Sequence, residues 1–521
     1  MSRQDACVEL ISASLKYRGA APEIFRQSRK FPRNGDKQII MHYSADDRDG
    51  TGERRRGDVD MLNGPVFKSL FIYTVPLLLS GILQLLYNAA DVAVVGRFAS
   101  DGEKALAAVG STGSLTNLIV SLFMGLSVGT NILVAHYLGA GRERDASETV
   151  HTAVLSSFIL GGILTVFGTV FARDFLTLMG NPDDVIDWAT LYIRIYFLGL
   201  PFNMAYNFGG AILRAKGNTR FPLITLVVSG LVNVFLNLVF VIQLRLDVAG
   251  VAAATVISQG LSAAMTLIYL SHLDDCCKLV PRQMRIHRDK LLKMARYGVP
   301  AGLQGSFFSL SNVVVQSAVN SLGSIAMAGN TAAANIDGFI YITGNSVYHG
   351  ALSFTGQNFG ACRFERIKKI YVCSLLLVVL YTFLLGAGSV LFAEPLLSIY
   401  APGADAADVR SYGLLRLSIM GPTYFLCGLM EVATGMLRGI GTSVRPMIIS
   451  MVGTIVVRIG WIKLLFYRVE YFHSMFWLYF SYPISWLFTF GLQLLAFALV
   501  YRRAVEKRMA EESLRGSTAK Q

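Results

Sequence analysis

Long apolar runs separated by short polar stretches dominate the chain from about residue 65 onward. Segments 219–243 and 370–393 are the clearest, since each reaches the roughly 20 residues that a helix needs to cross a bilayer. Twelve such segments are predicted, at 67–97, 105–138, 147–172, 184–212, 219–243, 248–272, 291–320, 325–358, 368–393, 408–436, 443–467 and 473–501. The pattern therefore predicts an all-α integral membrane protein with twelve transmembrane helices.

One turn occurs twice along the chain. Residues 213–222 read LRAKGNTRFP and residues 437–446 read LRGIGTSVRP, so Leu, Arg, Gly and Pro recur 224 positions apart (437 − 213). Pro76 and Pro300 are separated by the same offset. A sustained offset indicates an internal duplication. Each copy holds six predicted spans, an even number, so both copies cross the membrane in the same sense. We expect two pseudo-symmetric six-helix bundles with a binding cavity where they meet.

The repeat sets the expected domain organisation. We predict a disordered N-terminal extension at 1–64, an N-terminal six-helix bundle at 65–275, a cytoplasmic linker at 276–288, a C-terminal six-helix bundle at 289–503 and a cytoplasmic tail at 504–521. Within the repeated turn, Gly permits a left-handed helix end, Pro opens the next helix, and Arg is expected on the cytoplasmic side. The extension is either a regulatory tail or an artefact of a start codon placed before Met61.

Composition and charge agree with a membrane protein. Hydrophobic residues make up 53% of the 521 residues and charged residues only 16%, whereas soluble domains carry about a quarter charged residues. Lys and Arg number 47 against 34 Asp and Glu, a formal net charge of +13. The loops after even-numbered spans hold most of the basic residues, so both termini are expected in the cytoplasm and the chain in the plasma (inner) membrane. The excess faces anionic lipid and does not indicate a nucleic-acid partner.

Polar residues line one face of the first predicted span. Ser80, Gln84, Asn88 and Asp91 fall within an arc of about 80° at 100° per residue. Span 291–320 carries a looser version, and Asn88 corresponds to Asn312 at the repeat offset. These faces predict a hydrated substrate cavity. Its candidate residues are Ser80, Gln84, Asn88, Gln304, Asn312 and Gln316.

Three acids, Asp91, Asp337 and Glu431, lie well inside predicted spans. A carboxylate at the bilayer centre costs about 2.5 to 3.5 kcal/mol on insertion scales, so each should face a cavity or a partner. Such groups bind cations or change protonation state, although a structural hydrogen bond is the alternative for Asp91 and an anchor between helices for Asp337. Arg194 and Arg416, matched in the repeat, are interpreted as snorkelling or pairing with acids.

Two other function classes lack their sequence motifs. The chain has no GxxxxGK[ST] phosphate loop, so an ATP-driven pump would need another subunit, and an ion gradient is the simpler energy source. No HExxH or GxSxG arrangement occurs in a span, so a membrane-embedded enzyme is not indicated, and no cofactor is expected.

Several stretches together resemble the multidrug and toxic compound extrusion (MATE) family, bacterial branch. They are DVAVVGR (91–97), LRAKGNTRFP, GVAAATVISQ (250–259), TGQNFGA (355–361) and LRGIGTSVRP. The resemblance runs from about residue 65 to 500. It implies two six-helix bundles that export organic, often cationic and aromatic, compounds in exchange for Na⁺ or H⁺.

The resemblance also implies a coupling site. The family's first-helix aspartate corresponds to Asp91, and its partners on the fifth and sixth helices correspond to Asn233, Asn237 and Thr255. The family's second carboxylate is an amide here, Asn237, which leaves the choice between Na⁺ and H⁺ open; no metal is expected beyond Na⁺ at Asp91. In the second half Glu431 matches the family pattern, whereas span 291–320 offers only amides where an acid can occur.

The sequence thus favours a monomeric secondary transporter that works by alternating access on small organic substrates in the lipid bilayer. The alternative is a flippase for a lipid-linked or amphipathic metabolite within the same superfamily.

Overall fold

The computed structural model describes residues 58–401 and 406–518, which form α-helices joined by short turns. The first half contains α2 (Val66–Phe98), α3 (Gly102–Gly139), α4 (Glu143–Leu178), α5 (Asp183–Leu198), α6 (Leu200–Lys216), α7 (Arg220–Leu238), the π-helical turn η2 (Val239–Gln243) and α8 (Asp247–Ser271). The second half contains α9 (Arg288–Asn320), α10 (Ser324–Gly360), α11 (Phe364–Leu391), α12 (Ala393–Tyr400), α13 (Ala407–Gly439), α14 (Val444–Ser450), η5 (Met451–Val456), α15 (Val457–Gly460), η6 (Trp461–Phe466) and α16 (Met475–Thr518).

Each of the twelve predicted spans has its helix in the described chain, so the predicted fold class is confirmed. Among the residues that the structure describes, eight helices are long and apolar enough to cross a membrane on their own, and α5 with α6 makes a ninth. The segment predicted as one span at 184–212 is bent by 46° between these two helices. Pro201, at the second position of α6, explains the break because it cannot donate a backbone hydrogen bond.

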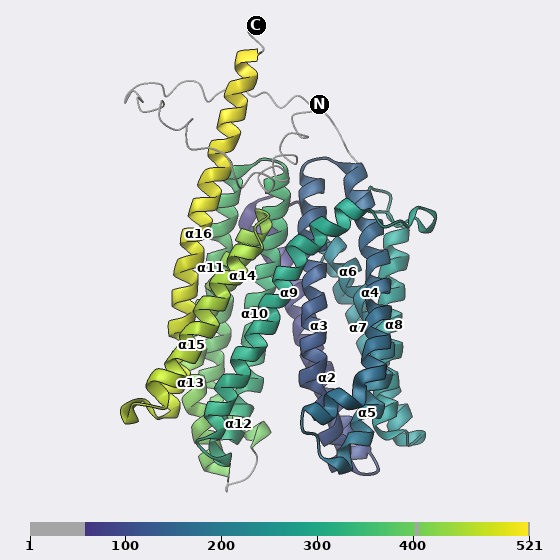
Figure 1. Cartoon of the computed structure of the whole chain (residues 1–521), viewed down its shortest axis with the longest axis vertical. Helices are drawn as coiled ribbons and strands as arrows, with labels where there is room; N and C mark the ends of the chain where they lie inside the picture. Colours follow the sequence, from purple (N-terminus) through teal and green to yellow (C-terminus); the bar gives the residue numbers. More distant parts are fainter. Residues whose placement is uncertain (1–57, 402–405, 519–521) are drawn as a thin grey trace.

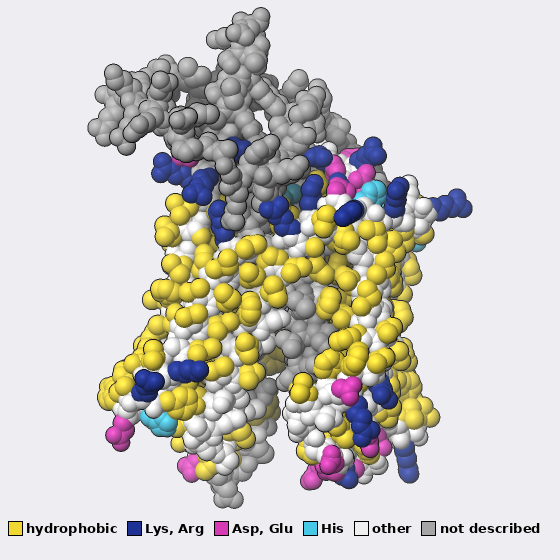
Figure 2. All heavy atoms as spheres, viewed as in Figure 1, with side chains coloured by type: hydrophobic (Ala, Val, Ile, Leu, Met, Phe, Trp, Pro, Cys, Tyr) yellow, Lys and Arg dark blue, Asp and Glu magenta, His cyan; other side chains and the backbone are white. Residues whose placement is uncertain are grey.

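Charged side chains lie at both ends of the molecule, and apolar side chains cover the middle of the face drawn in Figure 2. Lys and Arg gather at the end where α2 begins, and further Lys and Arg lie with Asp and Glu at the other end. We call the end where α2 begins the basic end, and the other the opposite end. The view in Figure 2 shows the two halves apart at the opposite end, whereas they meet toward the basic end.

The repeated turn has the predicted geometry in both halves. Gly217 caps α6 at φ 110°, and Gly441 follows α13 at φ 88°, both in the left-handed region that favours glycine. Pro222 and Pro446 each lie in the first turn of the next helix, where a missing N–H breaks no helical hydrogen bond.

Glycines bring the backbones of the two halves into contact. A Cβ on Gly298 of α9 would lie 2.6 Å from Leu126 Cα and 2.8 Å from the Gly125 carbonyl oxygen, both on α3. Such separations are shorter than van der Waals contact, so only glycine allows α3 and α9 to pack this closely. A second contact joins α2 to α10, where Gly81 packs against Ile342.

The hydrophobic cores do not follow the boundary between the halves. Leu70 and Tyr73, early in α2, belong to a core built mainly from α10, α11, α13 and α16. Met294 and Tyr297, early in α9, belong instead to the core of the first half. The beginnings of α2 and α9 are therefore exchanged between the two bundles at the basic end.

Residues 58–64 connect both halves at the basic end. On the first half, Asn218 donates to Asp58 Oδ1 at 2.9 Å and Lys216 pairs with Asp58 at 3.2 Å. On the second half, Asn358 donates to the Met61 carbonyl at 3.0 Å, and Met61 is buried. This segment was expected within the disordered extension at 1–64, and it differs because buried polar groups of both halves bond to it. The rest of that extension lies outside the described residues.

Candidate functional site

The four residues expected at the coupling site form one chain of hydrogen bonds. Asn237 of α7 donates from Nδ2 to Asp91 Oδ1 of α2 at 2.5 Å and, more weakly, to Asn233 Oδ1 at 3.3 Å. Asn233 in turn donates to Thr255 Oγ1 of α8 at 3.5 Å. Asn233 and Asn237 are one helical turn apart, so both amides reach the same side of α7. The structure thus brings together α2, α7 and α8 at Asp91.

Oxygen atoms predominate in this cluster. Asn237 is fully buried, and its Oδ1 has no hydrogen-bond partner among the residues that the structure describes. An unpaired buried carbonyl oxygen is unfavourable unless a proton or cation reaches it. Together with the Asp91 carboxylate, Asn233 Oδ1 and Thr255 Oγ1, it makes a donor set that suits Na⁺, and the carboxylate alone suits H⁺.

The polar face of α2 lies between the side that contacts α7 in the first half and the side that contacts α10 in the second half. Tyr87 packs against Gly230 of α7, whereas Leu85 lies near Gly338 of α10. Gln84 and Asn88 project between these directions, are exposed, and each lies about 160° around the helix from the apolar Leu86. They therefore face the space between the halves.

Ser80 is partly buried, and its hydroxyl donates to the Pro76 carbonyl within α2 at 2.8 Å.

On α9 only one of the three cavity candidates is free to face the space between the halves. Asn312 is exposed. It lies about 160° around the helix from Leu310, which belongs to the exposed apolar face of α9. Gln316 is engaged with Asn330, which donates to it at 3.0 Å. Gln304 is buried and accepts from Arg438 at 2.8 Å.

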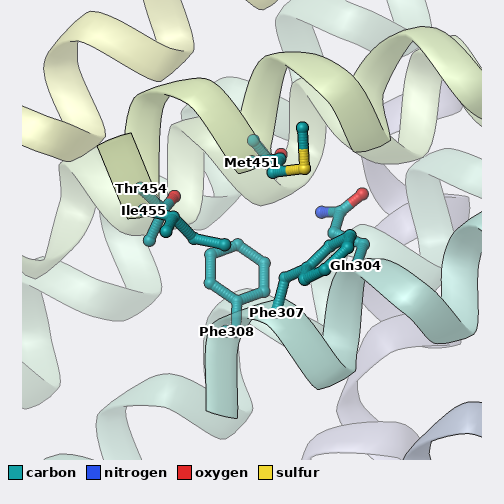
Figure 3. Close-up of a pocket in the computed structure, with 7 residues that line it drawn as sticks. Gln304, Phe307, Phe308, Met451, Thr454 and Ile455 are labelled. Atoms are coloured by element: carbon teal, nitrogen blue, oxygen red, sulfur yellow. The ribbon is translucent and has the colours of Figure 1, made fainter. Parts of the chain in front are cut away.

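Gln304 also lines a small crevice within the second half, between α9 and the η5 region (Figure 3). Its other walls are Phe307, Phe308, Ser450, Met451, Thr454 and Ile455. The lining is largely apolar and aromatic, which fits a helix-packing seam as well as the edge of an aromatic binding surface.

Asp337 is held by an ion pair. Arg416 of α13 donates to Asp337 Oδ2 of α10 at 2.8 Å and to Asn330 Oδ1 at 2.5 Å, and Tyr479 of α16 bonds to the same amide at 3.2 Å. All four groups are buried. This geometry favours the anchoring role for Asp337 and the pairing role for Arg416. Arg194 differs, because it is exposed and donates to the Thr169 carbonyl at 3.2 Å.

Glu431 is the second buried carboxylate candidate. Its side chain is 7% exposed and makes no hydrogen bond or ion pair with the residues that the structure describes. It lies on one face of α13 with Cys427 and Arg438, at steps of four and seven residues. An isolated buried carboxyl of this kind is suited to carry a proton.

Three arginines were missed as candidate site residues. Arg458 lies in the middle of span 443–467, between two π-helical segments, with its guanidinium 4.1 Å from the Tyr482 ring centroid and bonded to Ser485 at 2.9 Å. The signal for it is a basic residue inside a predicted span. Arg214 and Arg438 were expected merely to lie on the cytoplasmic side. They lie at the basic end, but Arg438 is only 5% exposed and bonds to Tyr348 and Gln304, and Nε of the partly buried Arg214 is enclosed.

Known proteins resemble the chain over most of its length. The MatE family profile matches residues 76–239 and 300–461, two stretches that begin 224 residues apart (300 − 76). The probable multidrug resistance protein YoeA of Bacillus subtilis (strain 168) is 30% identical over 393 residues, which are 74% of this chain and 84% of that protein. The FAD transporter of Shewanella oneidensis is 26% identical over 366 residues, 68% of this chain and 79% of that protein.

The fold has solved counterparts. A structure described as the outward-facing conformation of a multidrug resistance MATE family transporter of the MOP superfamily superimposes with a TM-score of 0.80 at 21% identity, over 87% of this chain and 100% of that one. The profile covers both copies of the internal repeat, and the fold has the two expected bundles. The chain therefore belongs to the MatE family and is a multi-pass membrane transporter rather than an enzyme.

Proposed function

We propose that the protein exports small organic compounds by alternating access, as a monomer, with one Na⁺ or H⁺ per cycle entering at Asp91. Membership of the MatE family and the similarity to multidrug resistance proteins support export of drugs and toxins. The observation that carries the coupling proposal is the hydrogen-bonded chain from Asp91 through Asn237 and Asn233 to Thr255. No resident cofactor is part of this proposal.

The charge of the site sets the number of ions. Asp91 is the single carboxylate in the cluster, because Asn237 holds an amide where the family has an acid. One negative charge balances one monovalent cation. At 100 mV, a single charge moving inward supplies about 2.3 kcal/mol, which supports a substrate gradient of roughly 40- to 50-fold at 1.4 kcal/mol per tenfold.

The bonds of Asp91 offer a route from ion to conformation. The charged carboxylate accepts from Asn237 Nδ2, which ties α2 to α7. A bound proton or Na⁺ neutralises the carboxylate, which weakens its charge-assisted hydrogen bond from the Asn237 N–H. The tie between the helices loosens, and α2, which also contacts α10, shifts relative to the second half.

The expected orientation has the basic end in the cytoplasm and the protein in the plasma membrane. The separation of the halves at the opposite end then faces outward, as in the related outward-facing structure. Gln84, Asn88 and Asn312, the exposed amides of α2 and α9, are the residues we assign to the substrate surface.

The test measures dye transport in inverted membrane vesicles with an imposed Na⁺ or pH gradient. Because the cytoplasmic face is outside in such vesicles, export appears as accumulation of dye in the lumen. Asp91→Asn should reduce gradient-driven transport to the level seen without a gradient, while the protein remains folded in the membrane. Asp174→Asn is the matched control, because Asp174 is exposed on α4 and the same substitution there leaves the site intact. Wild-type transport rates in Asp91→Asn would refute the coupling assignment.

The same vesicles distinguish the two ions and the flippase alternative. Acceleration by a Na⁺ gradient at constant pH identifies Na⁺, and acceleration by a pH gradient without Na⁺ identifies H⁺. A flippase for a lipid-linked or amphipathic metabolite would transport none of the soluble dyes. Because one relative is named a FAD transporter, the substrates tried should include aromatic compounds with phosphate groups.

A further inference from the structure

The two arginines of the repeated turn are withdrawn from the surface to different extents, since Arg438 is buried and Arg214 is partly buried. Arg438, at the end of α13, donates from Nη1 to the Tyr348 hydroxyl at 2.5 Å and from Nη2 to Gln304 Oε1 at 2.8 Å. Its Nε is buried and has no hydrogen-bond partner in the described chain. Neutral partners thus occupy only part of its donor set, since a guanidinium carries five N–H groups.

Arg214, at the end of α6, is less satisfied still. Its Nε is buried without a partner, and none of its side-chain nitrogens forms a hydrogen bond or ion pair with any residue placed by the structure. The Tyr73 hydroxyl donates to the Arg214 backbone carbonyl at 3.0 Å, which leaves the guanidinium without an acceptor.

Both arginines lie beside one short stretch of α10. Arg438 bonds to the Tyr348 hydroxyl, whose ring lies 4.9 Å from that of His349. The Tyr73 hydroxyl donates both to the Arg214 carbonyl at 3.0 Å and to Ser353 of α10 at 2.9 Å. One arginine from each bundle is thus placed next to α10 where the halves meet.

Acids do not neutralise this pair. Within residues 58–401 and 406–518, neither guanidinium has a carboxylate at ion-pair distance, in contrast to Arg416 with its 2.8 Å bond to Asp337. The acid that acts on Arg438 is Glu431, two helical turns earlier on α13, or about 10 Å along the helix at 1.5 Å per residue. Uncompensated buried charges of this kind are costly, so the site is incomplete without an anion.

We propose that Arg214 and Arg438 together bind an anionic group, a carboxylate or phosphate, of the transported aromatic compound. The inference rests on the proposed export function and narrows its substrate class. Guanidinium groups match the two oxygens of such anions, and the neighbouring Tyr73, Tyr348 and His349 provide aromatic surfaces for the rest of the molecule.

Such a site also explains how cargo drives the conformational change. When the halves part at the basic end, the two arginines move to separate walls and each holds the anion alone. When the halves close, the anion bridges both arginines and cancels their repulsion. A ligand that bonds both halves only in the closed form stabilises that form. Closure of the basic end without a bound anion is disfavoured. This limits transport cycles in which the coupling ion crosses the membrane without export of a substrate.

The test measures binding to the full-length protein in phosphatidylcholine nanodiscs, with no ion gradient. The probe is fluorescein, a dianion, followed by fluorescence anisotropy; rhodamine 6G, a cation with the same xanthene ring, is the ligand control. Arg214→Gln and Arg438→Gln should each weaken fluorescein binding at least tenfold. Arg445→Gln removes an exposed arginine from the same turn and should leave binding unchanged. Inorganic phosphate should compete with fluorescein.

Further variants separate this inference from misfolding and from the coupling proposal. Arg438→Lys keeps the positive charge but lacks the planar guanidinium, and it should lose less affinity than Arg438→Gln. If Arg438→Gln does not fold, Arg438→Lys provides the test of the site. Asp91→Asn should retain fluorescein binding even where it abolishes antiport. Unchanged fluorescein affinity in folded Arg214→Gln and Arg438→Gln overturns the proposal. Displacement of fluorescein by phosphatidylglycerol in the disc also overturns it, because the arginines would then hold a lipid headgroup.

Discussion

Gly298 of α9 gives the most direct test of how the halves close. In Gly298→Ala the new Cβ would lie 2.6 Å from Leu126 Cα and 2.8 Å from the Gly125 carbonyl oxygen. Carbon atoms at rest are about 3.5 to 4.0 Å apart, so α3 and α9 must separate by roughly 1 Å. Both obstacles are backbone atoms and cannot rotate away. Overpacking of this kind costs about 1 to 3 kcal/mol, which lowers the ratio of closed to open protein about 5- to 150-fold.

The readout is the exposure of a buried residue at the interface. Ser353 of α10 is inaccessible to solvent and bonds to Tyr73 of α2 at 2.9 Å. In a variant without native cysteines, Ser353→Cys should react with an impermeant maleimide only when the basic end opens. In inverted vesicles, Gly298→Ala should raise the labelling rate 5- to 150-fold, because this rate follows the open population.

The matched control is Gly305→Ala on the same helix, which gains the same helix propensity of about 0.5 to 1 kcal/mol. A Cβ there meets Ser121 Cβ at 3.7 Å, an ordinary contact, so labelling should stay at the wild-type rate. Equal rates in the two variants would show that the close approach of α3 and α9 does not limit closure, and the reasoning would fail.

Two other predictions concern stability in detergent, followed by thermal unfolding. Asp337→Asn should destabilise the protein by about 3 to 5 kcal/mol, because it leaves Arg416 buried and unpaired. The double variant with Arg416→Gln should recover part of the loss. If the losses of the two single variants add, the ion pair does not stabilise the protein. A chain that starts at Met61 lacks the bonds of Asp58 to Lys216 and Asn218 and should be less stable by about 1 to 2 kcal/mol than one that starts at Asp58. Equal stability would show that these bonds do not contribute.

The helices and the repeat were predictable because each rests on a local signal. Apolar runs of bilayer length marked the spans, and the glycine and proline of the repeated turn have the backbone geometry that their chemistry requires. The break at Gly199 was missed, although Pro201 signals it. A run of apolar residues shows that a segment spans the membrane but does not show where it bends.

The candidate site was only partly predictable, because side-chain partners depend on which helices meet. Asp91 and Asn237 were expected together from the family resemblance, and they are hydrogen-bonded. Helical spacing alone could not show that Arg416 would neutralise Asp337. Nor could it show that Arg438, in a turn rich in basic residues, would point inward to Tyr348. A basic residue near the end of a span is ordinarily taken as evidence of membrane orientation, so the buried side chain of Arg438 was not predicted.

The exchanged beginnings of α2 and α9 restrict how the transporter moves. If the bundles turned as two solid bodies, Leu70 and Tyr73 would leave one core while Met294 and Tyr297 left the other. Each stroke would then break apolar packing twice. Bending these two helices avoids this loss, and each has a proline inside it, Pro76 and Pro300, where one backbone hydrogen bond is already absent. Under the proposed alternating access, we therefore expect α2 and α9 to flex at these prolines, so that the stroke is a paired bending of two helices.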